Sequence, residues 1–167
     1  MLIREEKESG WPGVFNVNLA TFDTPAEAHV VNSLREQCRP LLSLVAEEDG
    51  RVIGHILFSP VQLSGHPNLH LMGLAPMAIV PEYQRTGIGS ALVKSGLDKC
   101  QTLRVGAVVV LGHSAYYPRF GFVPSVRYGI RCEYRAPEEA FMVLKLQAGY
   151  LAGKSGIIQY HDAFKNL

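Results

Sequence analysis

The chain alternates between short apolar runs and segments with helical spacing of apolar residues. Two strand-like runs, Leu42 to Glu47 and Val52 to Pro60, flank the pair Asp49-Gly50. Asp-Gly between two such runs predicts a tight hairpin. Turn residues at Ser64 to Asn68 separate the second run from a third, Leu69 to Val80. The pattern therefore predicts three strands that form a meander.

Two further segments have the apolar spacing of amphipathic helices. The first runs from Pro25 to Gln37, and its apolar face comprises Ala28, Val31, Leu34 and Cys38. Its start is predicted by an N-cap at Asp23-Thr24, by proline at the first helical position and by Glu27 in reach of the cap. The second runs from Thr86 to Gln101, where small residues such as Gly96 would let it lie close to a sheet.

Several shorter segments complete the expected fold. The predicted strands among them are Met1 to Arg4, Ala107 to Leu111, Phe141 to Leu146 and Gly156 to Tyr160. Ser9 to Gly13 is interpreted as a loop and His113 to Arg119 as a short helical turn, and a strand is expected to start at Phe120 to Val123. A strand, a helix and a second buried strand in sequence imply a parallel pair with a right-handed crossover. The fold class expected is α+β, with a mixed, mostly antiparallel sheet and a few helices.

A strand, a glycine turn and a helix start follow one another between Met77 and Leu92. The apolar run ends at Pro81, and Gly87-Ile88-Gly89 opens the helix. The first N–H groups of a helix have no internal partner, and the helix dipole adds partial positive charge there. Glycines remove the side chains that would keep a phosphate off the backbone. The stretch therefore predicts an anion site, although Leu92 stands where a Rossmann turn has its third glycine, and no P-loop pattern is present.

The order Gln-x-x-Gly-x-Gly, from Gln84 to Gly89 and directly after a strand and Pro81, resembles the acyl-CoA-binding motif of the GNAT acetyltransferase superfamily. The resemblance implies that the turn amides hold the pyrophosphate of coenzyme A. The cofactor-binding residues that it implies in this turn are Arg85, Thr86, Gly87, Ile88, Gly89 and Ser90. An ordinary strand-to-helix turn is the alternative interpretation.

The resemblance also extends to the preceding strand. It implies that the backbone of Met77, Ala78 and Ile79 pairs with the pantetheine arm as an added strand. It further implies a GNAT-like sheet that is splayed between its fourth and fifth strands and flanked by helices. Pro76 lies inside this strand, where proline removes a ladder hydrogen bond. A splay or a simple bulge would explain that proline equally well.

A second motif, Tyr116 to Phe122, is similar to the GNAT segment in which a tyrosine stands four residues before a Gly-Phe pair. In this chain that tyrosine is Tyr117. The resemblance implies that it is the general acid that protonates the departing coenzyme A thiolate. The alternative is that Tyr117 only packs its ring, which is also the interpretation of Tyr116.

The general base stays open on sequence grounds. Val110 stands where many family members have asparagine, and neither Leu69 to Val80 nor Ala107 to Leu111 contains a carboxylate. His113 follows the second of these strands. An unperturbed histidine titrates near ~6.5 and could accept a proton at neutral pH. We therefore name His113 as the candidate base, with a polar cap on a short helix as its alternative role.

Composition limits which classes of protein and which binding partners the chain is expected to have. The 167 residues suit a single domain, residues 1–167, and the formal net charge of +1 argues against a polyanion-coating surface. Three widely spaced cysteines and the histidines His55, His66 and His70 do not form a tight ligand set, so we expect no metal. No signal peptide or membrane span is visible, which favours a cytoplasmic protein without nucleic-acid or membrane partners.

The function that the resemblance implies is an N-acetyltransferase that moves an acetyl group from acetyl-CoA, its cosubstrate, to a primary amine by direct attack in a ternary complex. An acyl-CoA-binding regulatory or scaffold domain without turnover is the alternative, and a nucleotide-phosphate binder is a weaker one. The amine acceptor is not identified by the sequence, and a homodimer is left open.

Overall fold

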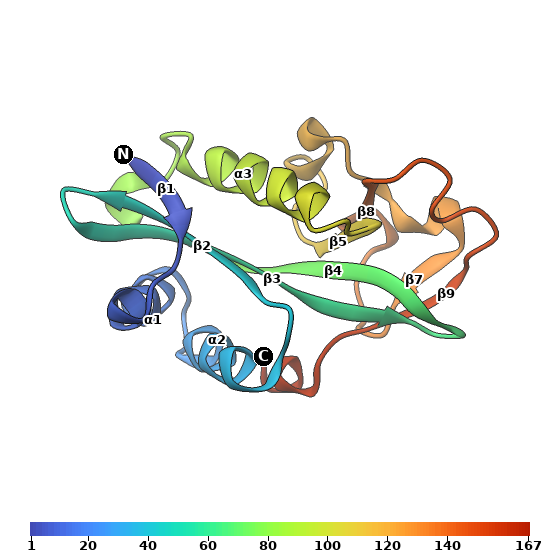
Figure 1. Cartoon of the computed structure of the whole chain (residues 1–167), viewed down its shortest axis with the longest axis horizontal. Helices are drawn as coiled ribbons and strands as arrows, with labels where there is room; N and C mark the ends of the chain where they lie inside the picture. The colour runs from blue at the N-terminus through green and yellow to red at the C-terminus, as the bar shows by residue number, and fades with distance from the viewer. The chain divides into compact units, whose positions relative to one another are not determined.

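The computed structural model of the protein describes residues 1–167, except for the side chain of Asn166. The helices shown in Figure 1 are α1 (Trp11–Thr21), α2 (Ala26–Gln37) and α3 (Ile88–Thr102). The strands are β1 (Leu2–Glu5), β2 (Leu42–Glu48), β3 (Arg51–Leu63), β4 (His66–Ile79), β5 (Ala107–Leu111), β6 (Val123–Pro124), β7 (Ile130–Cys132), β8 (Phe141–Lys145) and β9 (Gly156–Gln159). Short 3-10 turns join them: η1 (Glu8–Gly10), η2 (Pro81–Tyr83), η3 (Tyr117–Phe120), η4 (Ser125–Tyr128), η5 (Glu138–Ala140) and η6 (Asp162–Asn166).

The strands form a mixed, mostly antiparallel sheet in the order β1-β2-β3-β4-β5-β8-β6, and β9 pairs with both β3 and β7. The strand pair β4–β5 is parallel, with Leu71 opposite Ala107 and Gly73 opposite Val109. This pair confirms the crossover connection that the sequence predicts, and the architecture confirms the α+β fold class. The splay between the two strands beyond this ladder stays a prediction.

Two compact units divide the chain. The first contains Met1–Ser59, Ala75–Lys99 and Asp162–Leu167, and the second contains Pro60–Leu74 and Cys100–His161. The single domain over residues 1–167 therefore stays a prediction, and the two units are described separately below. In the part of the chain that the structure describes, no helix is long and apolar enough to cross a membrane.

The first unit is a sheet covered by helices on both faces. Helices α1 and α2 lie on one side of the strands and α3 on the other (Figure 1). Gly96 of α3 faces the ring of Phe58, and a Cβ added at Gly96 would overlap that ring. Gly54 of β3 is similarly crowded by Ile88 and Leu92. The close approach of helix and sheet that the small residues predict is confirmed, because glycine is the residue that leaves room for it.

The second unit has its own apolar core around β5 and β8. Its buried members are Val61, Leu63, Leu71, Ala107, Val109, Ile130, Phe141, Val143, Leu151 and Ile158. The ring of Tyr150 packs over Gly106, and its hydroxyl accepts a hydrogen bond of 2.7 Å from the backbone N–H of His70. The antiparallel register of β5 with β8 runs from Ala107 opposite Lys145 to Leu111 opposite Phe141.

Local predictions held where turn chemistry is strong. Asp49 and Gly50 have φ values of 50° and 77°, both left-handed, as a two-residue hairpin of type I′ requires. Helix α2 begins at Ala26, and its face of Ala28, Val31 and Leu34 is buried.

Other local predictions were wrong. The interval Ser9 to Gly13 is not a loop, because α1 begins at Trp11 with Pro12 in its first turn, where a proline N–H is not needed. The strand β7 was missed, and its three residues are too few to show a period. Glu27 was placed in reach of the helix cap. Instead, the Ala26 N–H bonds the Thr24 hydroxyl at 3.3 Å, and no cap hydrogen bond to Glu27 forms.

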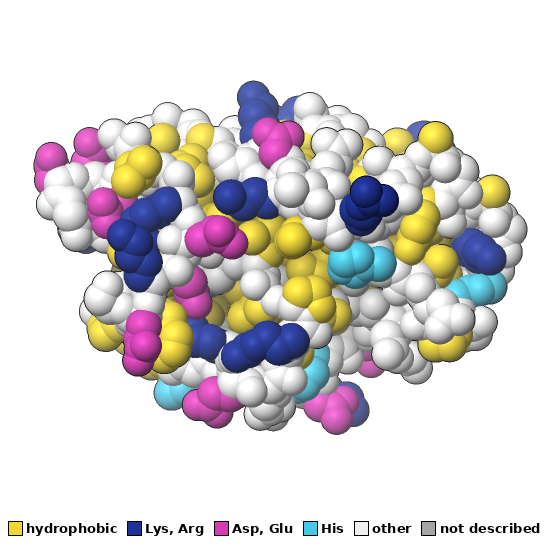
Figure 2. All heavy atoms as spheres, in the orientation of Figure 1, with side chains coloured by type: hydrophobic (Ala, Val, Ile, Leu, Met, Phe, Trp, Pro, Cys, Tyr) yellow, Lys and Arg dark blue, Asp and Glu magenta, His cyan; other side chains and the backbone are white. Residues whose placement is uncertain are grey.

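Charged side chains of both signs lie on the face drawn in Figure 2. Figure 2 shows acidic and basic groups interspersed with apolar ones over the face drawn there. This agrees with the formal net charge of +1. Cys38 and Cys100 are buried free thiols, and Cys132 is half-buried and also free.

Candidate functional site

The turn between β4 and α3 contains the residues that the first motif identified. After Ile79 the chain passes through η2 and reaches the left-handed conformation at Arg85 (φ 63°) and Gly87 (φ 90°). The turn is anchored to β3, since the Val80 N–H bonds the carbonyl of Ile53 at 3.0 Å. Two left-handed residues in quick succession turn the backbone sharply just before the helix begins.

The glutamine of the motif holds this turn in place. The Gln84 Nε2 donates a hydrogen bond of 2.9 Å to the carbonyl of Ile79, the last residue of β4. The Thr21 hydroxyl shares its single proton between the Val17 carbonyl at 2.8 Å and the same Ile79 oxygen at 3.0 Å. The Thr86 hydroxyl donates to the Tyr83 carbonyl at 2.5 Å. The sequence did not predict the role of Thr21, because it lies at the end of a helix whose start was interpreted as a loop.

The start of α3 suits an anionic group. The Ala91 N–H bonds the Gly87 carbonyl at 3.1 Å, so regular helical bonding starts there. The N–H groups before it lie in the first turn, where a helix offers donors and partial positive charge. The side chains of Arg85 and Thr86 are exposed, while Ile88 is buried and fixes the helix on the sheet. A phosphate can therefore approach the backbone without displacing a buried side chain.

The three strand residues expected to pair with the pantetheine arm are not equivalent. The Val80 N–H points to β3, and polar backbone groups alternate between the two edges of a strand. Those of Ala78 consequently face β3, whereas those of Met77 and Ile79 face the opposite edge. The carbonyl of Ile79 already accepts bonds from Thr21 and Gln84. By this alternation, the backbone of Met77 and the N–H of Ile79 face away from β3.

In the second unit, Tyr117 begins η3 and its side chain is buried, with 7% of its surface exposed. Its ring makes edge contacts with Tyr116 and Phe122, at centroid distances of 5.1 Å and 5.7 Å. Gly112 is needed here, because a Cβ at that position would lie 2.6 Å from the Tyr117 ring. This packing fixes the position of the Tyr117 ring.

The surroundings of Tyr117 keep its hydroxyl protonated. Burial, together with the neighbouring Tyr116, raises the pKa of Tyr117 to about 12. His113 is exposed, and its backbone carbonyl accepts the Tyr116 N–H at 3.0 Å. Strand β5 has the sequence Ala-Val-Val-Val-Leu and supplies no carboxylate. Among the described residues, no group of three histidine, cysteine, aspartate or glutamate side chains is arranged to hold a metal ion.

Comparison with known proteins identifies the family. The model of the acetyltransferase (GNAT) family matches residues 11–122. The Escherichia coli K12 protein described as uncharacterized N-acetyltransferase YhbS is 39% identical over 165 residues, 98% of each chain. The chain belongs to the GNAT acetyltransferase family. It is therefore an acyltransferase, and both motifs of the sequence lie in the region that the family model covers or end at its boundary.

Solved GNAT structures show the same architecture. The crystal structure of Escherichia coli YhbS in complex with CoA has a TM-score of 0.92 at 38% identity, covering 98% of this chain and 91% of that one. A GNAT acetyltransferase from Brucella melitensis in complex with acetyl-CoA has a TM-score of 0.79 at 32% identity, covering 98% and 97%. Both relatives were captured with the ligand that the glycine turn predicts.

A buried polar chain in the first unit was not predicted. His55, fully buried in β3, contacts the Asn18 amide through Nδ1 (3.2 Å) and the Ser43 hydroxyl through Nε2 (2.8 Å). Ser43 donates to Glu6 at 2.7 Å, and Arg35 clamps the same carboxylate with two bonds of 2.9 Å. No local pattern in the sequence indicates it, because its members come from four elements and from the segment after β1, far apart in the chain.

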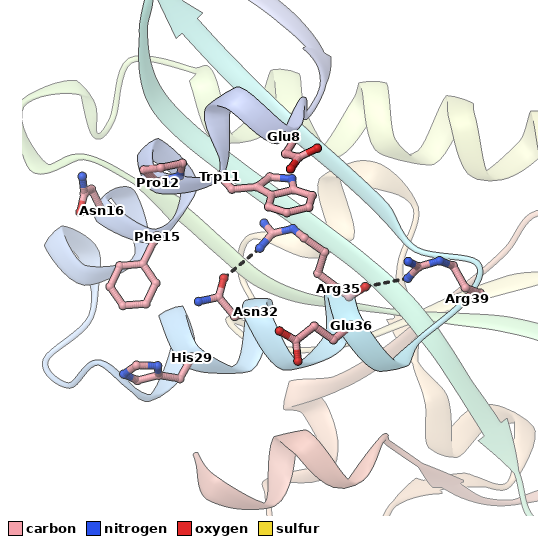
Figure 3. A pocket seen from close by; sticks show the side chains of 10 residues that line it. All are labelled: Glu8, Trp11, Pro12, Phe15, Asn16, His29, Asn32, Arg35, Glu36 and Arg39. Atoms are coloured by element: carbon pink, nitrogen blue, oxygen red, sulfur yellow. Dashed lines mark hydrogen bonds between the residues drawn. The ribbon is translucent and has the colours of Figure 1, made fainter.

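Arg35, at the end of this hydrogen-bond chain, also lines a surface cavity between α1 and α2 (Figure 3). The cavity has a volume of about 940 Å³. The guanidinium of Arg35 lies 4.6 Å from the centre of the Trp11 ring and donates to Asn32 at 2.8 Å. The rings of Phe15 and His29 meet edge-on at 5.3 Å. Arg35 is thus committed to structural contacts, and the cavity is a feature of the helix pair rather than of the cofactor turn.

Proposed function

We propose that the protein transfers an acetyl group from acetyl-CoA to a primary amine by direct attack in a ternary complex. The observation that carries the proposal is the β4–α3 turn, where Gln84 and the left-handed Arg85 and Gly87 precede exposed helix donors. CoA-bound and acetyl-CoA-bound relatives at 38% and 32% identity support it. No metal is required by this chemistry.

The proposed cosubstrate site lies on the backbone of the glycine turn and of the strand that precedes it. The backbone from Arg85 to Ser90 would hold the pyrophosphate, because the first turn of α3 offers donors and positive potential. Met77 and the N–H of Ile79 would pair with the pantetheine arm, and strand N–H groups of this kind can also stabilise negative charge on a thioester carbonyl. Ala78 would contribute its small side chain rather than its polar backbone.

The proposed reaction needs one proton removed and one supplied. The neutral amine nitrogen forms a bond to the thioester carbonyl carbon, and the carbon–sulfur bond breaks with its electron pair on sulfur. The nitrogen loses a proton, and Tyr117 supplies one to the sulfur. A pKa of about 12 keeps the Tyr117 hydroxyl protonated at neutral pH, so it can donate its proton to the sulfur. His113, exposed after β5, is the proposed proton acceptor or the residue that orders a water in that role.

A regulatory acyl-CoA-binding domain without turnover is the second candidate. The observation in its favour is that β5 and β4 carry no carboxylate that could act as base. The transferase and the regulatory domain are distinguished by incubating the purified protein with acetyl-CoA and a panel of primary amines. Release of free thiol is measured, and the products are identified by mass spectrometry. Thiol release that depends on an amine and yields the acetylated amine supports the transferase. Tight CoA binding without any amine-dependent thiol release would favour the regulatory domain.

A further inference from the structure

Thr21, the last residue of α1, contacts the strand of the proposed cosubstrate site directly. Its hydroxyl shares one proton between the carbonyl of Val17 at 2.8 Å and the carbonyl of Ile79 at 3.0 Å. The bond to Val17 stays within the helix, where a threonine hydroxyl commonly bonds the carbonyl four residues earlier. The bond to Ile79 joins two residues that are 58 positions apart in the chain. The helix alone does not require this second contact.

The peptide between Ile79 and Val80 is held by hydrogen bonds at both of its ends. At one end, the Ile79 oxygen accepts bonds from Thr21 and from the Gln84 side chain, and a carbonyl oxygen has two lone pairs. At the other end, the Val80 N–H bonds the carbonyl of Ile53 at 3.0 Å. The Ile79 oxygen is therefore fully used by the protein, and its direction is fixed.

The N–H of Ile79 lies on the edge of β4 that is proposed for the pantetheine arm. The N–H and C=O of one strand residue point to the same edge, and those of Ile79 face away from β3 because the Val80 N–H bonds β3. Donors that hold the carbonyl of Ile79 in this direction also favour the extended conformation that presents its N–H to an added strand.

Helix α1 is a firm anchor for this contact. Its Asn18 amide contacts the ring of His55 in β3 at 3.2 Å, so the helix is bonded to the sheet independently of Thr21. Thr21 is half-buried, whereas Gln84 is exposed. Water competes less with a half-buried hydrogen bond than with an exposed one, so Thr21 is the stronger of the two constraints on Ile79.

We propose that Thr21 is a positioning residue of the cosubstrate site, whose hydroxyl holds Ile79 so that its N–H meets the pantetheine arm of coenzyme A. This inference rests on the proposed function. The glycine turn has bonds of its own, from the Tyr83 N–H to the Val80 carbonyl at 2.9 Å and from the Thr86 hydroxyl to the Tyr83 carbonyl. Loss of the Thr21 hydroxyl should thus weaken binding of the pantetheine arm and spare that of the pyrophosphate.

The test compares CoA with adenosine 3′-phosphate 5′-diphosphate, the fragment of CoA that has the pyrophosphate and lacks the pantetheine arm. By isothermal titration, Thr21→Val should bind CoA roughly 3- to 10-fold more weakly than the parent, the effect of one ordinary hydrogen bond. Its affinity for the fragment should equal that of the parent. Thr21→Ser keeps the hydroxyl and should bind CoA like the parent. Thr24→Val is the matched control, because the Thr24 hydroxyl bonds the Ala26 N–H and not β4.

Thermal unfolding checks that each variant is folded, and Thr21→Ala, which also lacks the hydroxyl, replaces Thr21→Val if valine disrupts the fold. Equal loss of CoA and fragment affinity overturns the inference, because that result is expected of a residue that only supports the fold. Parental CoA affinity in folded Thr21→Val overturns it too, as does a Thr21→Ser protein that binds CoA as weakly as Thr21→Val. A parent that binds CoA but releases no thiol with any amine refutes the proposed transfer alone, and the titrations still decide the role of Thr21.

Discussion

The Nε2 of His55 lies 2.8 Å from the hydroxyl oxygen of Ser43, and this contact fixes the direction of a buried hydrogen-bond chain. Ser43 donates its proton to the carboxylate of Glu6, so the oxygen of Ser43 must accept from His55. Nδ1 is then the acceptor for the amide of Asn18 at 3.2 Å. His55 is therefore neutral and carries its proton on Nε2.

Acid should destabilise the protein through this chain. Burial, helped by the charge of Arg35, lowers the pKa of His55 from 6.5 to about 4. Between these values the unfolded chain binds a proton that the folded one does not, so stability is present above pH 6.5 and is lost as the pH falls toward 4. At 1.36 kcal/mol per pH unit the loss is about 3 kcal/mol. Urea unfolding at pH 7.0, 5.5 and 4.5 measures it.

The variant His55→Gln isolates this contribution. It should be less stable than the parent at pH 7, because Asn18 and Ser43 lose partners, but its stability should fall less between pH 6.5 and 4. Glu6 adds a further loss below its ordinary pKa in both proteins. Burial raises the pKa of that carboxyl, but hydrogen bonds from Arg35 and Ser43 outweigh burial and hold it low. Parallel pH profiles for parent and variant would remove His55 from this account.

Gly96→Ala should destabilise the first unit. The added Cβ would overlap the ring of Phe58, so α3 would have to move away from β3. Overpacking of this kind typically costs about 1–3 kcal/mol. Gly10→Ala is the control, since nothing lies within 4 Å of a Cβ there and its φ of −95° suits alanine. Equal unfolding midpoints for both variants in guanidinium would contradict the packing described here.

Gly89→Val should weaken CoA binding. A branched side chain at this position of the first turn of α3 would stand where the pyrophosphate is proposed to approach the backbone. Isothermal titration with CoA measures the affinity, and thermal unfolding checks that the variant is folded. Gly10→Val serves as the control for inserting a valine at an unrelated glycine. A folded Gly89→Val protein with parental CoA affinity would refute the phosphate assignment.

Tyr117→Phe should keep the fold and lower turnover roughly 10- to 100-fold, the lower end of general acid catalysis. The ring contacts to Tyr116 and Phe122 survive in the variant, and only the hydroxyl is removed. Because the pKa of Tyr117 is about 12, the parent should show no loss of activity below pH 10 that depends on this residue. Full kcat in the variant would reduce Tyr117 to a packing residue, whereas loss of CoA affinity alone would make it a cosubstrate contact.

His113→Gln tests the proton acceptor. His113 is exposed, so the substitution should leave stability unchanged and act on the reaction alone. If His113 takes the amine proton, the kcat/KM profile of the variant against pH should differ from that of the parent. An unchanged profile would exclude His113 from the mechanism and direct attention to an ordered water.

Sequence reasoning succeeded where a local pattern determines the structure. The pair Asp49-Gly50 predicted a hairpin, and both residues do adopt left-handed backbone angles. Gly96 predicted close packing of its helix on the sheet, because glycine has no side chain to keep the two apart. Helix α1 was not predicted because Gly10, Pro12 and Gly13 are typical of loops. Tertiary contacts, such as the close approach of Gly13 to Val52, stabilise it instead.

The polar chain around His55 could not be predicted for a different reason. Its members are Glu6, Asn18, Arg35, Ser43 and His55, and their contacts form only in the packed arrangement of helices and strands. The missing cap contact of Glu27 is a similar case. A capping box is a local motif, but in the structure the Ala26 N–H bonds the Thr24 hydroxyl, and Glu27 makes no cap hydrogen bond.

The carbonyl oxygen of Ile79 is shared by Thr21 from α1 and Gln84 from the glycine turn. A helix on one face of the sheet and a loop at the end of its strand are thereby coupled through a single atom. A rotation of that peptide would lengthen both bonds at once, so neither segment can shift without disturbing the geometry of the other.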